Sequence, residues 1–545
     1  MTQNTHLQKE KMLKSTVWST IGNFASRFLG LIYVIPWYAW LGQQAKQANA
    51  LFTMGYNIYA YFLLISTAGI PVAISKQIAK YHAKDEADKV YPMLRNTLLC
   101  MGVLGMIMAV LMYLAAPAIA ILSGSGLALI PVIHSLSLAV VIFPVMSVIR
   151  GIFQGYANLK PYAMSQIAEQ VIRVIWILLF TFMIMKMSSG SHDYVDAVTQ
   201  STFAAFVGMV ASLMLLIYYL HKEGLLASIL SSQYKANGKE TLLMLFETLK
   251  EAIPFIITGS AIQLFQLIDQ VTFINTMHRL TTYSQKTLED QFAYFSGNPN
   301  KIIMMLVAVA LSIGGVGIPL LTENHTKGDT KASANLIVHN LTMLFFLLIP
   351  AVMGGILLAK PIYTFFYEVP NGLALALFIV CLVQTLILAM YTVSSPMLQA
   401  LFENKRGIHY FLEGVAIKLL AQLPCIYLAH AYGPLIATTL GLGWAVYRIL
   451  RRIYEVTAFD GQLLLKRLLA VSGYALLAGV LAGLSNLAVA LVLPVTGKVS
   501  SVVHLLVSGT IFALVYGVIT LYKRLLDILI GEVRADVLRK RLHLS

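Results

Sequence analysis

The chain has 545 residues, of which 58% are hydrophobic and 12% charged, and its formal net charge is +15. Soluble domains carry about 25% charged residues, so this composition and a mean hydropathy of +0.76 exclude a soluble protein and indicate many membrane crossings. The positive charge does not predict a nucleic-acid partner, because the cations gather in the loops on one side of the predicted spans.

Fourteen apolar segments are long enough to cross a bilayer as helices, since one crossing takes about 20 residues. We therefore predict an all-α polytopic membrane protein. In chain order the predicted spans cover residues 16–41, 50–80, 91–121, 128–157, 161–187, 194–220, 252–278, 302–324, 333–358, 370–401, 407–430, 432–453, 468–493 and 499–522.

A repeat in the sequence predicts two related halves. Gly-Ile-Pro ends one span at residues 69–71 and another at 317–319, and Arg173 corresponds to Lys418 at a similar offset. A transporter built from two repeats usually binds its substrate between them. The expected parts are an N-lobe at 1–221, an interlobe cytoplasmic linker with an amphipathic helix at 222–251, a C-lobe at 252–455, two extra helices at 456–522 and a basic cytoplasmic tail at 523–545.

The loop charges predict the orientation. With fourteen spans, 29 of the 39 Lys and Arg residues fall on the side of the N-terminus, seven on the opposite side and three within spans. Because cytoplasmic loops are enriched in Lys and Arg, we predict that both termini are cytoplasmic. The outer side then carries a polar loop at 279–300, which we expect to shape the outer mouth.

Three cations within spans are the strongest functional signal, because a charge at the centre of a span is unfavourable by about 2.5–3.5 kcal/mol. Arg27 lies near the middle of the first span with no acid close to it in sequence. It is expected either to bind an anionic ligand or to pair with an acid from another helix. Glu169 precedes Arg173 by one helical turn, so these two form either a structural ion pair or a tuned cavity cation. Lys418 has no acidic residue one helical turn away on its own helix.

The seventh span carries a polar stripe. Gln263, Gln266 and Gln270 share one helix face, and Asp269 is the acid within the apolar stretch. The stripe predicts either a helix contact or a cavity lining, and Asp269 is a candidate for coupling to a proton or a sodium ion.

Two cations at the predicted membrane surface have a second interpretation. Lys76 either extends to lipid headgroups or receives an anionic substrate at the inner gate, and Arg150 is expected to be a headgroup cation. The sequence shows neither a nucleotide-phosphate loop nor a zinc pair, and its three cysteines are far apart. We therefore expect no enzyme activity, no metal and no cofactor.

Short motifs carry a family resemblance. Residues 23–30 (Asn-Phe-Ala-Ser-Arg-Phe-Leu-Gly), the Gly-Ile-Pro end of the second span and Arg150-Gly-x-x-Gln154-Gly resemble the multidrug/oligosaccharidyl-lipid/polysaccharide exporter superfamily. Within it they are similar to the Gram-positive MurJ-type branch, close to the SpoVB relatives. The likeness covers nearly the whole chain.

The resemblance implies a V-shaped, two-lobed flippase that moves a lipid-linked oligosaccharide, lipid II, from the inner to the outer leaflet by alternating access. It implies that Arg27 holds the diphosphate and that Lys76 lies near a basic inner gate. A further family arginine in the eighth span has no counterpart, since only Asn324 and His325 lie near its end. We expect Arg173 and Lys418 to complete the diphosphate site.

Other hypotheses about the function stay open at this point. They are a flippase for a teichoic-acid or polysaccharide unit, a cation-coupled drug exporter, and a membrane-embedded synthase or scaffold. The energy source for transport is not decided by the sequence, and the candidates are membrane potential, H⁺ and Na⁺. We expect a monomer in the plasma membrane of a Gram-positive bacterium, in contact with membrane lipids and with the machinery of cell-wall synthesis.

Overall fold

The computed structural model describes residues 25–67, 70–83, 90–156, 158–187, 193–231, 253 and 256–543, and within these ranges every regular element is a helix. The predicted all-α fold is therefore confirmed. After a helical segment over residues 25–32, the helices are α2 (Val34–Leu41), α3 (Ala45–Thr67), α4 (Ile70–Ala83), α5 (Val90–Leu122), α6 (Leu129–Gly155), α7 (Leu159–Met187), α8 (Asp193–Lys222), α9 (Leu225–Leu230), α11 (Ala261–Leu280), α12 (Gln285–Phe292), α13 (Asn298–Thr326), α14 (Thr330–Leu357), α15 (Ala359–Phe366), α16 (Gly372–Ala400), α17 (Asn404–Ala429), α18 (Gly433–Thr457), α19 (Gly461–Val492), α20 (Lys498–Tyr522), α21 (Asp527–Ile530) and α22 (Glu532–Arg541).

Nine helical stretches of the described chain are long and apolar enough to cross a membrane, and one of them, Asn404–Thr457, contains both α17 and α18. Most predicted spans coincide with one long helix to within a few residues. The predicted span at 50–80 differs, because its residues form α3 and α4. Pro71 lies at the start of α4, where its missing N–H group is tolerated. The count of fourteen crossings stays a prediction.

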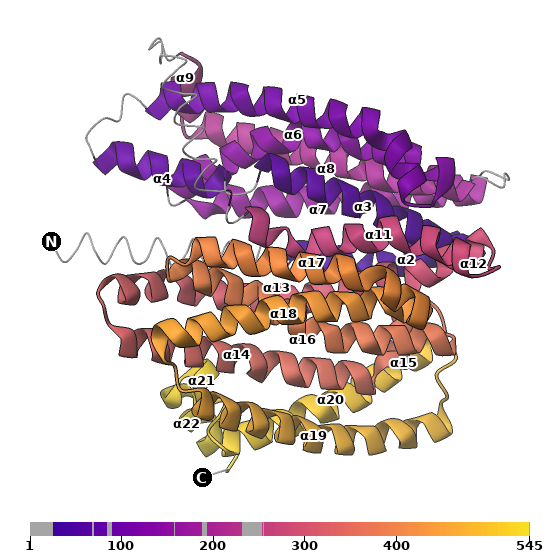
Figure 1. Cartoon of the computed structure of the whole chain (residues 1–545), viewed down its shortest axis with the longest axis vertical. Coiled ribbons are helices and arrows are strands. Elements are labelled where there is room, and N and C mark those ends of the chain that lie inside the picture. The colour runs from indigo at the N-terminus through magenta and orange to yellow at the C-terminus, as the bar shows by residue number, and fades with distance from the viewer. Residues whose placement is uncertain are drawn as a thin grey trace. The chain divides into compact units, whose positions relative to one another are not determined.

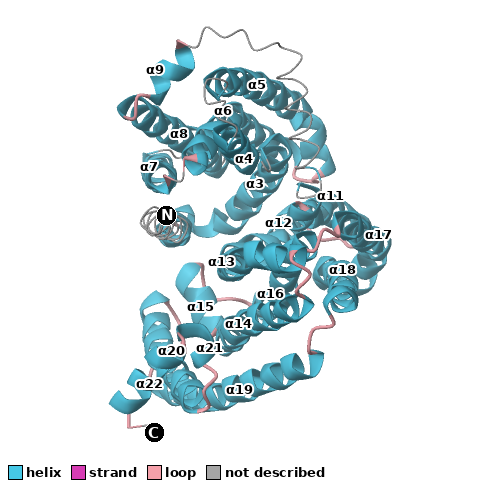
Figure 2. Cartoon of the chain, turned by 90° about the vertical axis from the view of Figure 1, so that its left-hand side faces the viewer, coloured by secondary structure: helices cyan, strands magenta, loops and turns pink. Residues whose placement is uncertain are grey.

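The chain forms two compact units, residues 1–293 and 294–545. In the first unit α5, α6, α7 and α8 lie lengthwise beside one another (Figure 1). In the second, α13, α14, α16 and α18 pack together, and α19 and α20 pack on α14 (Figure 2). Aromatic and small side chains fill that last contact, where the Tyr516 hydroxyl donates to the carbonyl of Phe346 at 2.8 Å.

Glycines set how closely neighbouring helices approach. A Cβ atom at Gly105 of α5 would lie 2.6 Å from the carbonyl oxygen of Val141 on α6. At Gly414 of α17 it would lie 2.7 Å from the carbonyl oxygen of Gly441 on α18. Because lipid is as apolar as leucine, helices in a membrane associate through such close backbone contacts.

The predicted outer loop at 279–300 is wrong as a loop, because most of it is helical. Ser284 caps α12 by accepting a hydrogen bond from the N–H group of Thr287, and Leu288 and Phe292 bury the apolar face of that helix. Because many of its residues are polar, the sequence predicted a loop in place of this short amphipathic helix. A π-helical turn, Ala293–Gly297, then leads directly into α13.

The chain passes from one unit to the other within this short stretch. Asp290 of α12 accepts a hydrogen bond from Gln47 of α3 at 3.0 Å, within the first unit. Five residues later the carbonyl of Phe295 accepts from Cys381 of α16 at 3.4 Å, within the second. The compact units therefore differ from the predicted lobes, whose boundary lay at 222–251, and the lobes stay a prediction.

Candidate functional site

A buried cluster of charge in the first unit joins α6, α7 and α8. Glu169 of α7 accepts a hydrogen bond from Arg173 on the same helix at 2.6 Å and, through its other oxygen, from Arg150 of α6 at 3.0 Å. The three side chains are between 8% and 16% exposed. We name Arg150, Glu169 and Arg173 the arginine triad. Its net charge is +1, because one carboxylate faces two guanidinium groups.

Arg150 is held by side chains from both α7 and α8. Its Nε donates to Ser165 of α7 at 3.2 Å, and its Nη2 donates to Ser212 of α8 at 3.1 Å. Its guanidinium carbon lies 5.6 Å from the ring centroid of Tyr162. The expectation that Arg150 is a headgroup cation is wrong, because the residue is 6% exposed and its donors are directed into the helix bundle. The sequence could not predict its pairing with Glu169, because the two residues lie on different helices.

Arg173 differs from Arg150 because part of its guanidinium is unused. Its Nε is buried and has no hydrogen-bond partner in the described part of the chain. The phenol groups of Tyr33, Tyr56 and Tyr59 lie close enough to interact with it electrostatically. A planar guanidinium with an unused Nε donor, in a cluster of net positive charge, is suited to an anionic acceptor such as a phosphate or carboxylate group.

Helix α8 packs closely on α7 beside the triad. A Cβ atom at Gly208 of α8 would lie 2.6 Å from the carbonyl oxygen of Glu169 and 3.3 Å from the Cβ of Arg173. Glycine at this position lets α8 lie against α7 at Glu169, while Ser212 of the same helix bonds Arg150 of α6. The predicted pair of Glu169 and Arg173 is thus present, but Glu169 is shared with a second arginine that the sequence did not assign to it.

Two other predicted cations lie elsewhere on the first unit. Arg27 lies in the helical segment over residues 25–32, and its side chain is exposed. Lys76 lies in α4, and its side chain falls outside the described residues. Their predicted roles toward an anionic substrate stay predictions.

Lys418 ties two helices of the second unit together. It is fully buried in α17, and its ammonium donates to the carbonyl of Pro434 at 3.0 Å and to the hydroxyl of Thr438 at 2.7 Å, both on α18. In this arrangement its charge is directed at α18. The expected contact between Lys418 and a diphosphate stays a prediction that would require these bonds to be exchanged.

The polar stripe of the seventh predicted span lies on α11. Gln270 is fully buried, accepts from Asn57 of α3 at 3.2 Å and donates to Ser123 at 3.0 Å, so this end of the stripe is a helix contact. Asp269 beside it is 7% exposed. Gln263 and Gln266 are half-buried, and the side-chain oxygen of Gln263 is buried without a hydrogen-bond partner among the described residues.

No group of three or more His, Cys, Asp or Glu side chains that could hold a metal ion occurs within the described ranges. The arginine triad offers a positive charge and hydrogen-bond donors, which can bind an anion.

Comparisons with known proteins find a matching family and similar relatives. The family described as "Polysaccharide biosynthesis protein" matches residues 12–325. The lipid II flippase MurJ of Bacillus subtilis (strain 168) is 34% identical over 443 residues, which are 79% of this chain and 80% of that protein. Stage V sporulation protein B of the same organism is 26% identical over 44% of this chain and 45% of its own length.

Solved structures share the fold. A structure of the lipid II flippase MurJ in an inward closed conformation gives a TM-score of 0.66 at 16% identity and covers 94% of this chain and 100% of its own. An inward-facing multidrug resistance MATE family transporter of the MOP superfamily gives a TM-score of 0.59 at 16% identity, over 83% of this chain and 99% of its own. At these identities the match shows the architecture only.

Proposed function

The chain belongs to the polysaccharide biosynthesis protein family and, within it, to the family of the lipid II flippase MurJ, and from that membership we propose that it is a lipid II flippase. The observation that carries this proposal is the 34% identity to MurJ, which extends over most of both chains. The protein acts as a multi-pass membrane transporter rather than as an enzyme. It moves lipid II from the inner to the outer leaflet by alternating access through a cationic cavity.

The arginine triad supports the recognition of an anionic headgroup. Lipid II carries a diphosphate, and the unused Nε of Arg173 together with the net charge of +1 favours such a group. Glu169 keeps two guanidinium groups together in a poorly hydrated environment, where they would otherwise repel each other. Arg27 is proposed as a second diphosphate contact, with Lys76 at the inner gate and Lys418 as a further cation.

We further propose how the protein is driven and where it works. The membrane potential acts on the charged headgroup, and buried Asp269 is the candidate for coupling to H⁺ or Na⁺. The protein functions as a monomer in the plasma membrane of a Gram-positive bacterium, with cytoplasmic termini, and contacts membrane lipids and the cell-wall synthesis machinery. No cofactor takes part.

The decisive experiment is depletion of the protein in a Gram-positive host that lacks other lipid II flippases. We expect lipid II to accumulate on the inner side, and the wild-type chain to restore the externally accessible pool. Arg27→Ala is expected to fail at normal protein levels, with Arg279→Ala, at an exposed position in the last turn of α11, as the control for loss of a cation. External lipid II that persists after depletion would contradict the proposed substrate, and teichoic-acid precursors would then be measured.

A further inference from the structure

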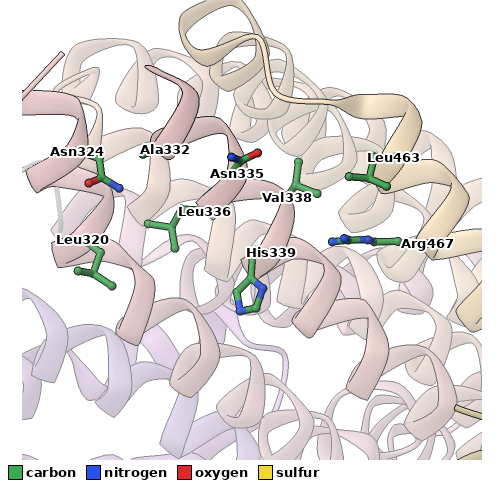
Figure 3. Close-up of a pocket in the computed structure, with 9 residues that line it drawn as sticks. All are labelled: Leu320, Asn324, Ala332, Asn335, Leu336, Val338, His339, Leu463 and Arg467. Carbon is green, nitrogen blue, oxygen red and sulfur yellow. The ribbon is translucent and has the colours of Figure 1, made fainter. Parts of the chain in front are cut away.

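A cleft of about 670 Å³ lies at one end of the second unit, between α13, α14 and α19 (Figure 3). Asn335 and His339 project into it from α14, one helical turn apart, while Asn324 comes from α13 and Arg467 reaches across from α19. The remaining lining is apolar or small. The cleft belongs to neither the arginine triad nor the polar stripe of α11, both of which lie in the first unit.

Arg467 is the cation of this lining and is not neutralised by an acid. Its guanidinium forms a long hydrogen bond, 3.5 Å from Nη1 to the hydroxyl of Thr342, and within the described ranges it forms no ion pair. The carboxylates at the helix ends are used elsewhere. Asp329 caps α14, Asp460 caps α19, and Glu323 pairs with Lys327 at 2.5 Å. The cleft therefore carries a positive charge together with hydrogen-bond donors from two amides and an imidazole.

The cleft lies at the level of the lipid headgroups in the membrane. A helix of 28 residues, such as α14, is roughly 42 Å long, which matches a bilayer of about 40–45 Å including its headgroups. Arg467 is the seventh residue of α19 and lies roughly 9 Å from its start. Because helical side chains lean toward the N-terminus, its guanidinium extends back toward the headgroup layer.

The surroundings are suited to acyl chains. Leu463 and Leu320 line the cleft and are 38% and 50% exposed, and Leu469 follows on α19 at 61%. A ligand with a phosphate at Arg467 would place its chains over these leucines. A free anion would leave them exposed, so the combination favours a lipid over a soluble phosphate.

We propose that this cleft binds the phosphate headgroup of an anionic glycerophospholipid, in the leaflet that the loop charges predict to be cytoplasmic. Arg467 forms the charged contact, and Asn324, Asn335 and His339 donate or accept around the phosphate and glycerol. The site holds a lipid of the bulk membrane and does not depend on the assignment of lipid II as the transported substrate.

Native mass spectrometry of the full-length protein in detergent, titrated with dioleoylphosphatidylglycerol, tests this site without any measurement of transport. We expect Arg467→Gln to weaken the tightest-bound lipid about tenfold, the loss of one charge-assisted hydrogen bond. Arg467→Lys should retain most of the affinity. Lys466→Gln is the matched control, since it removes an exposed cation next to the cleft, and should change binding by less than about twofold.

Three outcomes would overturn the proposal. Equal losses in Arg467→Gln and Lys466→Gln would show unspecific attraction to a basic surface. Equal affinity for dioleoylphosphatidylcholine would show that acyl chains alone are bound. Displacement of the lipid by excess inorganic phosphate would identify a soluble anion as the ligand. Asn335→Leu, at an exposed position, should also weaken binding with unchanged circular dichroism, and covers the case in which Arg467→Gln does not fold.

Discussion

Arg150 and Arg173 have unequal roles although they share one carboxylate. Arg150 satisfies Glu169, Ser165 and Ser212 together, so removing it would leave a buried acid and two hydroxyls to find new partners. Arg173 donates to Glu169 and, within the described part of the chain, retains an unused Nε. The first arginine is therefore a structural residue, and the second is the one that we propose as a ligand contact.

This difference predicts opposite effects of two substitutions. Arg173→Gln should leave the pair of Arg150 and Glu169 intact and change thermal stability little, yet abolish export of lipid II. Glu169→Gln should lower stability by about 3–5 kcal/mol, because two buried cations lose their counter-charge. Thermal unfolding in detergent and the depletion assay measure the two properties. Normal export by Arg173→Gln would remove that residue from the proposed site.

At the scale of the helix, the triad joins α6 to α7, and α8 lies in backbone contact with α7 beside it. A methyl group at Gly208 would meet the carbonyl oxygen of Glu169, whereas Gly443 of α18 has open space around the same position. The spacing of Glu169 and Arg173 on one helix could be read from the sequence. The contribution of Arg150, Ser165 and Ser212 could not, because it arises from the close approach of three helices.

Gly208→Ala is therefore expected to destabilise the protein by about 1–3 kcal/mol, since the two helices must move apart. Gly443→Ala is the matched control and should be neutral or slightly stabilising, because alanine favours a helix over glycine. Differential scanning fluorimetry of both variants measures the effect. Equal melting temperatures would mean that the contact of α7 with α8 yields without strain.

For the whole molecule, composition and apolar segments predicted the all-α fold and the approximate position of most of the long helices. Continuous hydrophobicity is a strong signal, whereas α12 was missed because a short amphipathic helix resembles a polar loop. Lys418 shows a second limit, since a repeat offset relates positions but does not say which way a side chain points. The carbonyl of Pro434 and the hydroxyl of Thr438, which hold its ammonium, lie on the next helix.

The predicted orientation can be tested by cysteine labelling in intact cells. After replacement of Cys100, Cys381 and Cys425 by serine, Lys498→Cys should react with a membrane-impermeant maleimide, because its loop is predicted to be external. Lys327→Cys, at the end of α13, should react only after the membrane is permeabilised. The reverse pattern would invert the topology and place the lipid cleft in the outer leaflet.

The short stretch of chain between Asp290 and Phe295 determines where labels should be placed to follow movement of one unit relative to the other. Since α11 is bonded to Asn57 and Ser123, a fluorophore or spin label on it reports on the first unit, although the sequence repeat assigns that helix to the second half. A label on α13, a few residues beyond the π-helical turn, reports on the second unit. Two labels close together in the sequence can therefore be used to measure the distance between the two units.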